Sequence, residues 1–245
     1  MLKIENYEVL GWEHAIRGMR NPKNSWDRSD SLFFDDSQGH LCHIGQGKVE
    51  GDGISMIVVG DNDHKLMMTL ASGGPVHAKY RRMITVYLDI TAPLYWWKEF
   101  DTYKVSTVAN SCSTMHKIHA KEFTLDDFSC EHLMALDDQT VPYASNIKSI
   151  YDFKSVMEGT IEALNNAREW YLETKDKKYW WQMIQLLPTS YNQKRTVMLN
   201  YEVLHNIYES RRHHKLDEWH TLCDWIEKLP YAEIIIGEKK DGKAE

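Results

Sequence analysis

The spacing of the apolar residues changes near residue 146, and this change constrains the fold more than any other feature of the sequence. Before it, the apolar runs are of strand length, as at 54–59 and at 83–90, where Ile84, Val86 and Leu88 occupy every second position. After it, apolar residues recur at helical spacing, at Ile150, Phe153, Val156, Met157, Ile161 and Leu164. The sequence therefore predicts an α+β fold, with a sheet in the N-terminal half and a helical C-terminal half.

Turn-forming and capping residues divide the chain further. We expect residues 1–236 to form a single domain and the charged segment 237–245 to be a disordered tail. In chain order, the other expected elements are a strand at 7–12, a helix at 13–19, a long loop at 22–53, a helix at 65–71 capped by Asp61 and Asn62, a helix at 94–100, a polar loop at 102–116, and helices at 178–187, 195–212 and 217–228.

Composition and charge exclude several classes of protein. Of the 245 residues 42% are hydrophobic, which is enough for a substantial core. The net charge of −7 argues against a general nucleic-acid-binding protein, which would have a basic surface. No apolar run approaches the roughly 18 residues of a membrane span, and no signal-peptide pattern opens the chain. The four cysteines form no CxxC pair, so we expect reduced thiols in a cytoplasmic protein.

Two histidine clusters could be taken for metal sites. His40, Cys42 and His43 lie close together, but their spacing matches no closed zinc set. His213, His214, His220 and Glu218 could also hold a metal, although cationic side chains at a helix end more often face solvent. We therefore expect no metal site.

The segment 195–212 combines polar side chains with an apolar stripe. If it is one helix, Asn200 and Arg211 share a face with Leu204 and Ile207, and Asn206 lies about 120° around the axis. Amide and guanidinium groups beside an apolar stripe need hydrogen-bond partners, because burying them unpaired is costly. Those partners can be a ligand or the protein itself, and the spacing alone leaves both open.

The same segment resembles the C-terminal pattern of the flavin-dependent thymidylate synthases. Leu187-Pro188, Asn200, Asn206 and Arg211 match that pattern without a gap. The resemblance implies that the two asparagines contact the FAD cofactor and that Arg211 helps to hold the deoxyuridylate substrate. It also implies a homotetramer, while the net charge and the short apolar runs lead us to expect no nucleic acid and no membrane as a partner.

A weaker resemblance covers residues upstream, so that about 55–228 is matched in all. The run 73–77, Gly-Gly-Pro-Val-His, resembles the family's Gly-His turn, and 109–114 resembles its substrate loop. The loop match implies that Asn110 contacts the cofactor and that Ser113 contacts the substrate. Lys104 is the basic residue of the neighbouring segment that could take part in substrate binding.

The sequence departs from the family where the family places its positive charges. The Arg-His-Arg signature is absent from the corresponding segment 100–105, Ser111 and Met115 replace a glutamate and an arginine of the substrate loop, and Ile184 replaces another arginine. A bound phosphate requires charge-assisted partners. Replacement cations could come from Lys79, Arg81, Arg82, Lys98 or Lys104, although the cluster at 77–82 could equally be a solvated edge.

Three interpretations of function follow. The family reaction would be FAD-dependent methylation of dUMP to dTMP, with methylenetetrahydrofolate as carbon donor and NADPH as reductant. The alternative is a non-catalytic nucleotide- or flavin-binding regulatory homo-oligomer that keeps the fold without the chemistry. An unrelated α+β domain with a chance helix match is the third. The missing signature leaves the first two undecided, and the catalytic residues stay unassigned.

Overall fold

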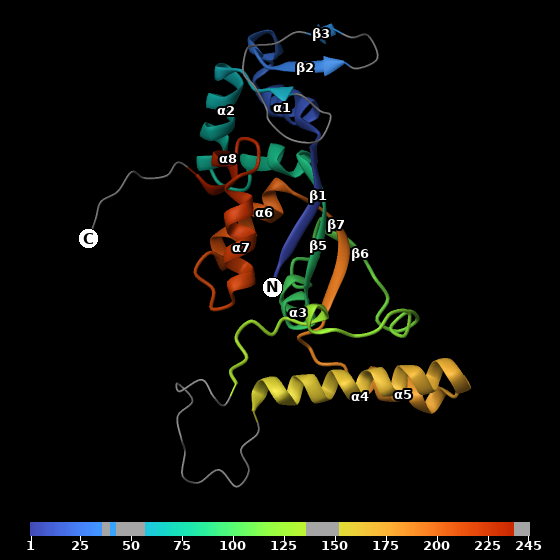
Figure 1. Cartoon of the computed structure of the whole chain (residues 1–245). Helices are drawn as coiled ribbons and strands as arrows, with labels where there is room; N and C mark the ends of the chain where they lie inside the picture. The colour runs from blue at the N-terminus through green and yellow to red at the C-terminus, as the bar shows by residue number, and fades with distance from the viewer. Residues whose placement is uncertain (36–39, 43–56, 136–151, 238–245) are drawn as a thin grey trace, which may run out of the picture. The chain divides into compact units, whose positions relative to one another are not determined.

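A computed structural model describes residues 1–35, 40–42, 57–135 and 152–237 (Figure 1). The chain divides into two compact units. Unit 1 contains residues 1–3, 91–101 and 111–195, and unit 2 contains residues 4–90, 102–110 and 196–245. The single domain expected over 1–236 stays a prediction, and the expected tail lies outside the described residues beyond Gly237.

A four-stranded sheet has the strand order β1-β5-β7-β6. Its strands are β1 (Lys3–Leu10), β5 (Thr85–Pro93), β6 (Val108–Ser111) and β7 (Asn192–Asn200), and the chain passes from one unit to the other within each of them. The inner positions of β5 are buried at Val86, Leu88 and Ile90, as the alternation predicts. The α+β prediction is confirmed, although β7 comes from the C-terminal half.

A second, three-stranded sheet in unit 2 occupies part of the segment expected to be a loop. It has the order β3-β2-β4, with β2 (Leu32–Asp35) antiparallel to both β3 (His40–Cys42) and β4 (Ile57–Val58). Short 3₁₀ turns at Asn21–Lys23 and Trp26–Arg28 precede it. The loop prediction for 22–53 was therefore wrong at Leu32–Asp35 and His40–Cys42, which are strands.

The helices of unit 2 pack around buried aromatic side chains. They are α1 (Trp12–Arg20), α2 (Asp61–Ser72), the 3₁₀ helix η3 (Ala78–Met83), α6 (Tyr201–Arg211), α7 (Asp217–Ile226) and α8 (Glu233–Ile236). Trp12 makes edge contacts with Tyr201 and Tyr231, at centroid distances of 5.4 and 5.3 Å. The Tyr201 hydroxyl donates to the carbonyl of Pro230 (2.8 Å), so this buried phenol is satisfied.

Two local features fix the starts of helices α1 and α2 in unit 2. Gly11, before α1, has a φ of 89°, and a Cβ there would lie 2.1 Å from the carbonyl oxygen of Met83. Only glycine fits this position. At α2, the Asp30 carboxylate accepts hydrogen bonds from the backbone amides of Asn62 (2.9 Å) and Asp63 (3.1 Å). A side chain from a distant loop therefore satisfies the first amides of the helix, in place of the expected local cap.

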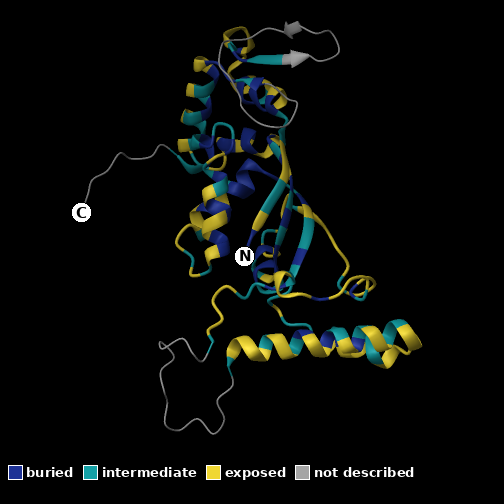
Figure 2. Ribbon diagram, viewed as in Figure 1, coloured by how far each residue is buried: buried dark blue, intermediate teal, exposed yellow. Residues whose placement is uncertain are grey.

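Unit 1 contains α3 (Leu94–Phe100), which the sequence predicted with the same bounds, and two longer helices, α4 (Phe153–Thr174) and α5 (Lys177–Leu186). Asp152 and Asp176 cap the longer helices by accepting the amide hydrogens of the residues two positions on. Figure 2 shows that much of α4 and α5 is exposed. A small apolar core packs their remaining face, with Ile118, Phe123, Phe128, Ile161, Leu164, Ala167 and Met183.

The segment expected to be one helix over 195–212 is a strand followed by a helix. Strand β7 ends at Asn200, and α6 begins at Tyr201. Val197 and Leu199 are buried at alternate positions, which is the spacing of a strand. Asn200 and Arg211 therefore do not share a helix face. Within the described residues, no helix is long and apolar enough to cross a membrane.

Candidate functional site

Arg211, at the last turn of α6, is held by two aromatic side chains of unit 2. Its Nε donates a hydrogen bond to the hydroxyl of Tyr103 (3.0 Å). The centre of its guanidinium lies 4.8 Å from the Trp219 ring centroid and 5.8 Å from that of Tyr103. These are cation–π distances, and Trp219 is fully buried. The arginine is thus held in place by the protein before any ligand arrives.

The aromatic setting of Arg211 extends into the start of α7. The Trp219 ring has its centroid 6.1 Å from Tyr103 and 6.2 Å from His214. The Nδ1 atom of His214 accepts the backbone amide hydrogen of Leu216 (3.2 Å), which fixes this ring at the turn between α6 and α7. We call Tyr103, Arg211, His214 and Trp219 the arginine cluster.

Lys104 and Asn110 lie in the same unit as the arginine cluster. Lys104 directly follows Tyr103 in the chain and is exposed. Asn110 is exposed in β6. The structure therefore places both predicted ligand contacts at the surface, where a ligand could reach them.

The other two asparagines have different environments. Asn200 is buried, and its Oδ1 accepts the backbone amide hydrogen of Val203 (3.1 Å), so it is the N-cap of α6. Asn206 is exposed on α6. The cap contact accounts for Asn200 without a ligand, which makes Asn206 the more accessible of the two.

Ser113 belongs to unit 1, whereas the other predicted contacts belong to unit 2. Its hydroxyl oxygen accepts the backbone amide hydrogens of Met115 (3.3 Å) and His116 (2.9 Å) in a local turn. The carbonyl of neighbouring Cys112 accepts a hydrogen bond from the Gln193 side chain (2.7 Å). The predicted substrate loop is therefore well ordered by contacts with its own unit.

The candidate replacement cations differ in burial and in partners. Arg81 is buried, and its Nη1 lies 3.6 Å from a carboxylate oxygen of Glu202 on α6. This buried pair holds η3 against α6 and offsets the arginine charge. Lys79, Arg82 and Lys98 are exposed. In the cluster at 77–82, Lys79 and Arg82 are exposed, as at a solvated edge, whereas the buried ion pair of Arg81 was in neither interpretation of the sequence.

The segment that replaces the family signature contains an ion pair in unit 1. The Asp101 carboxylate accepts a hydrogen bond from Nη1 of Arg195 (2.8 Å). The guanidinium of Arg195 also lies 4.2 Å from the Trp97 ring centroid and donates from Nε to the Gln193 side chain (3.0 Å). The sequence did not indicate Arg195, Tyr103 or Trp219. The Arg195–Asp101 and Arg211–Tyr103 contacts join residues far apart in the chain, and no local pattern marks Trp219 as a partner of Arg211.

Among the described cysteines, the buried Cys223 is not activated as a nucleophile. Burial raises the pKa of the Cys223 thiol to about 11, which leaves it protonated at neutral pH. Cys112 is exposed. Within the described part of the chain, no group of three or more His, Cys, Asp or Glu could hold a metal ion. The cluster at 40–43 lies outside the residues whose side chains are described.

Comparison with known proteins identifies the fold. No family model and no curated protein sequence matches the chain. Two structures of the flavin-dependent thymidylate synthase ThyX from Helicobacter pylori, complexed with FAD and dUMP, are similar to it. Their TM-scores are 0.57 and 0.58, their identities 16% and 15%, and the matches cover 95–96% of this chain and 95% of each of theirs.

A third similar structure is the UMP/dUMP methylase PolB from Streptomyces cacaoi, bound with 5-Br dUMP. Its TM-score is 0.52 at 13% identity, over 93% of this chain and 89% of that chain. At such low identity the likeness concerns the fold and not the activity. The chain therefore has the fold of the flavin-dependent thymidylate synthases.

Proposed function

We propose that this chain is a divergent flavin-dependent thymidylate synthase-like protein that binds dUMP and FAD. The observation that carries the proposal is the arginine cluster. Arg211, the residue that matches the family's substrate arginine, is fixed at the end of α6 by Tyr103 and Trp219. A guanidinium held in one orientation loses little freedom when it binds an anion, which favours recognition of a nucleotide phosphate.

The donor groups around the arginine cluster suit a nucleotide monophosphate. Arg211 provides a planar guanidinium and Lys104, one residue after Tyr103, provides an exposed ammonium group. Partly exposed Tyr103 adds aromatic surface beside these charges, and buried Trp219 packs behind it. We assign Arg211, Lys104 and Ser113 to the nucleotide.

The flavin contacts proposed for this chain are its three asparagines. Asn110 and Asn206 are exposed and can offer both amide atoms, whereas Asn200 uses its Oδ1 as a helix cap and would contact the flavin through its amide nitrogen. When bound, FAD would supply the hydride chemistry, with NADPH as reductant and methylenetetrahydrofolate as carbon donor in the methylation of dUMP to dTMP. The residues of this chain would bind and orient these molecules.

A second candidate function is a non-catalytic nucleotide- or flavin-binding protein. It is favoured by the segment that replaces Arg-His-Arg, whose side chains contact the protein itself. Asp101 pairs with Arg195, and Tyr103 accepts the hydrogen bond of Arg211. These contacts take the place of the positive charge that the family signature would bring to a phosphate.

Ligand titrations test the binding that both functions require. The purified protein should show a flavin absorbance spectrum or take up FAD, and dUMP should raise its melting temperature. Arg211→Gln should weaken dUMP binding about tenfold to a hundredfold, the value of one hydrogen bond to a charged group. Arg212→Gln is the matched control, because the Arg212 guanidinium lies over the Tyr208 ring, whereas that of Arg211 lies over the Trp219 ring.

The outcome of a turnover assay then decides between them. Formation of dTMP from dUMP, methylenetetrahydrofolate and NADPH supports the synthase. Binding of FAD or dUMP without any dTMP supports the non-catalytic protein. If neither FAD nor dUMP binds when the ligand is present at high concentration, both proposals are contradicted.

We also propose that the chain forms a homo-oligomer, a tetramer by resemblance to the family. The support within unit 1 is the exposed apolar surface of α4 and α5. Phe153, Val156, Trp170, Trp181 and Leu186 are 42–53% exposed. Clusters of exposed apolar side chains mark association surfaces. Light scattering should give a mass several times that of the 28.8 kDa chain, and a monomer at micromolar concentration would contradict the proposal.

A further inference from the structure

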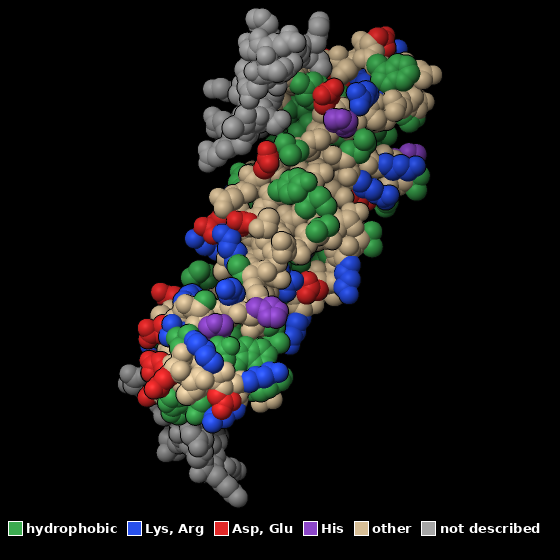
Figure 3. Space-filling model, turned by 90° about the vertical axis from the view of Figure 1, so that its right-hand side faces the viewer, with side chains coloured by type: hydrophobic (Ala, Val, Ile, Leu, Met, Phe, Trp, Pro, Cys, Tyr) green, Lys and Arg blue, Asp and Glu red, His purple; other side chains and the backbone are tan. Residues whose placement is uncertain are grey.

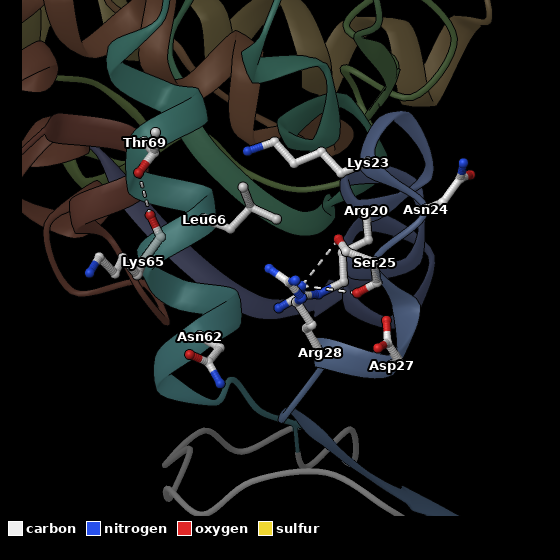
Figure 4. A pocket seen from close by; sticks show the side chains of 10 residues that line it. All are labelled: Arg20, Lys23, Asn24, Ser25, Asp27, Arg28, Asn62, Lys65, Leu66 and Thr69. Atoms are coloured by element: carbon white, nitrogen blue, oxygen red, sulfur yellow. Dashed lines mark hydrogen bonds between the residues drawn. The ribbon is translucent and has the colours of Figure 1, made fainter.

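Unit 2 contains a cavity of about 670 Å³ between α2 and the segment that follows α1 (Figure 4). Its wall includes Arg20, Lys23 and Arg28 from the N-terminal segment, and Asn62 and Thr69 from α2. None of these residues belongs to the arginine cluster. The volume falls within the range of small-molecule binding sites in proteins.

The base of the cavity contains a buried arginine with an unused donor. Arg20 is 3% exposed. Its Nε donates to Asp63 (2.5 Å) and its Nη1 donates to the backbone carbonyl of Ser25 (3.1 Å). Its Nη2 is buried, and no described residue accepts a hydrogen bond from it. A buried charged group without a partner is costly, so the site favours an acceptor that would satisfy it.

Three further cations line the same cavity: Lys23, Arg28 and, from α2, Lys65. Figure 4 shows Lys23 and Arg28 extending from their segment toward α2. Neither forms an ion pair with another described residue. Asp27 is the acid on the wall. Asp63 offsets the charge of Arg20, so the lining sets Lys23, Arg28 and Lys65 against the one carboxylate of Asp27, and the positive charge is in excess.

This local charge differs from the surface elsewhere. On the face shown in Figure 3, basic and acidic side chains are intermingled, and the chain has a net charge of −7. A long polyanion would be repelled by such a surface, whereas a small anion that enters the cavity meets mainly cations. The Asn62 amide on the opposite wall can bind a polar group of the same ligand.

We propose that this cavity binds a small phosphorylated molecule, whose phosphate contacts Arg20, Lys23 and Arg28. A phosphate offers several acceptor oxygens, which match the guanidinium and ammonium donors of the three residues. One oxygen would accept the hydrogen bond that Nη2 of Arg20 cannot make within the described chain. The site is separate from the proposed dUMP and FAD contacts and does not depend on them.

Titration with pyrophosphate tests the site. The full-length protein should bind pyrophosphate in calorimetry, and the ligand should raise its melting temperature. Arg28→Gln and Lys23→Gln should each weaken that binding about tenfold to a hundredfold. Both residues are exposed, so neither substitution threatens the fold in the way that loss of Arg20 would.

Arg17→Gln is the matched control, because Arg17 is an exposed arginine of α1 that pairs with Glu13 outside the cavity. It should leave pyrophosphate binding within about twofold, since Arg17 does not line the cavity and its exposed charge is screened by solvent. Failure of the wild-type protein to bind pyrophosphate overturns the proposal, as does an equal loss in Arg17→Gln. Binding that survives Arg28→Gln but is lost in Arg211→Gln also overturns it, because the anion then occupies the proposed nucleotide site.

Discussion

Replacing Asp63 by asparagine should destabilise unit 2 more than any other isosteric change in α2. Asp63 is fully buried. One carboxylate oxygen accepts from Arg20, and the other accepts from the backbone amides of Asp30 and Ser31 (3.1 Å each). The hydroxyls of Ser29 and Ser31 also donate to it. Every group that faces the carboxylate is a donor, so an asparagine amide would turn its own N–H bonds toward one of them.

The cost follows from two effects. The substitution leaves the Arg20 charge buried without its counter-ion, and breaking a buried ion pair on one side costs about 3–5 kcal/mol. The amide also leaves at least one donor unsatisfied. For a chain of this length, about 1 kcal/mol shifts the melting temperature by about 2–4 °C, so the expected decrease is about 6–20 °C.

Calorimetry and circular dichroism measure the effect. If the two units melt separately, only the transition of unit 2 should move, because Asp63 and its partners all lie there. Asp61→Asn is the control: Asp61 is exposed in the first turn of α2, and loss of its charge should cost only about 0.3–1 kcal/mol. A decrease for Asp63→Asn no larger than that for Asp61→Asn would refute the reasoning.

Three further predictions concern single residues. Asn200→Ala should lower the free energy of unfolding by about 1 kcal/mol, because the α6 cap is lost, and Asn200→Ser should keep most of that stability. Urea denaturation measures both variants, and equal free energies of unfolding for the two would contradict the cap. Gly11→Ala should destabilise by more than about 1 kcal/mol, because φ is 89° and the new Cβ would meet the Met83 carbonyl; an unchanged melting temperature would be inconsistent with this contact. At pH 8, iodoacetamide should modify Cys112 well before Cys223, since burial raises the pKa of the Cys223 thiol from 9.0 to about 11 and lowers its thiolate fraction about a hundredfold. Peptide mass spectrometry checks the order, and equal rates in the native protein would rule out the shift.

The same shift has a consequence for stability at alkaline pH. The thiol of Cys223 holds its proton more tightly in the folded protein than in the unfolded chain. Its contribution to stability is therefore fully present below about pH 9 and is lost as the pH rises through about 11. The buried phenol of Tyr80, whose pKa is raised to about 12 by burial, acts in the same direction at higher pH.

Local signals in the sequence predicted those elements whose ends are marked by local chemistry. Helix α3 was predicted with the bounds that it has, because Pro93 sets its start and the apolar residues of Leu94–Phe100 bury themselves within unit 1. Helix α2 was also predicted, although its cap was not. The cap is the Asp30 carboxylate, a side chain some thirty residues away, and no pattern near Asp61 indicates it.

The prediction failed where a strand leads directly into a helix. Between 192 and 211, buried positions follow a period of two up to Leu199 and a helical period from Tyr201 onward. Apolar residues at both periods can be fitted to one helix if the junction is ignored. The local signal at the junction is Asn200, a strong N-cap residue directly after a β-branched and apolar run.

The proposed nucleotide site depends on how charge is redistributed around the lost signature. Asp101, in the segment that lacks the Arg-His-Arg signature, carries a carboxylate, and Arg195 neutralises it within unit 1. Tyr103, in the same segment, has no charge and holds Arg211 instead. The contribution of this segment to the proposed site is therefore that Tyr103 orients Arg211. If dUMP binds here, Arg211 carries most of the phosphate recognition, and its loss should weaken binding far more than the loss of exposed Lys104, whose ammonium group is hydrated and screened.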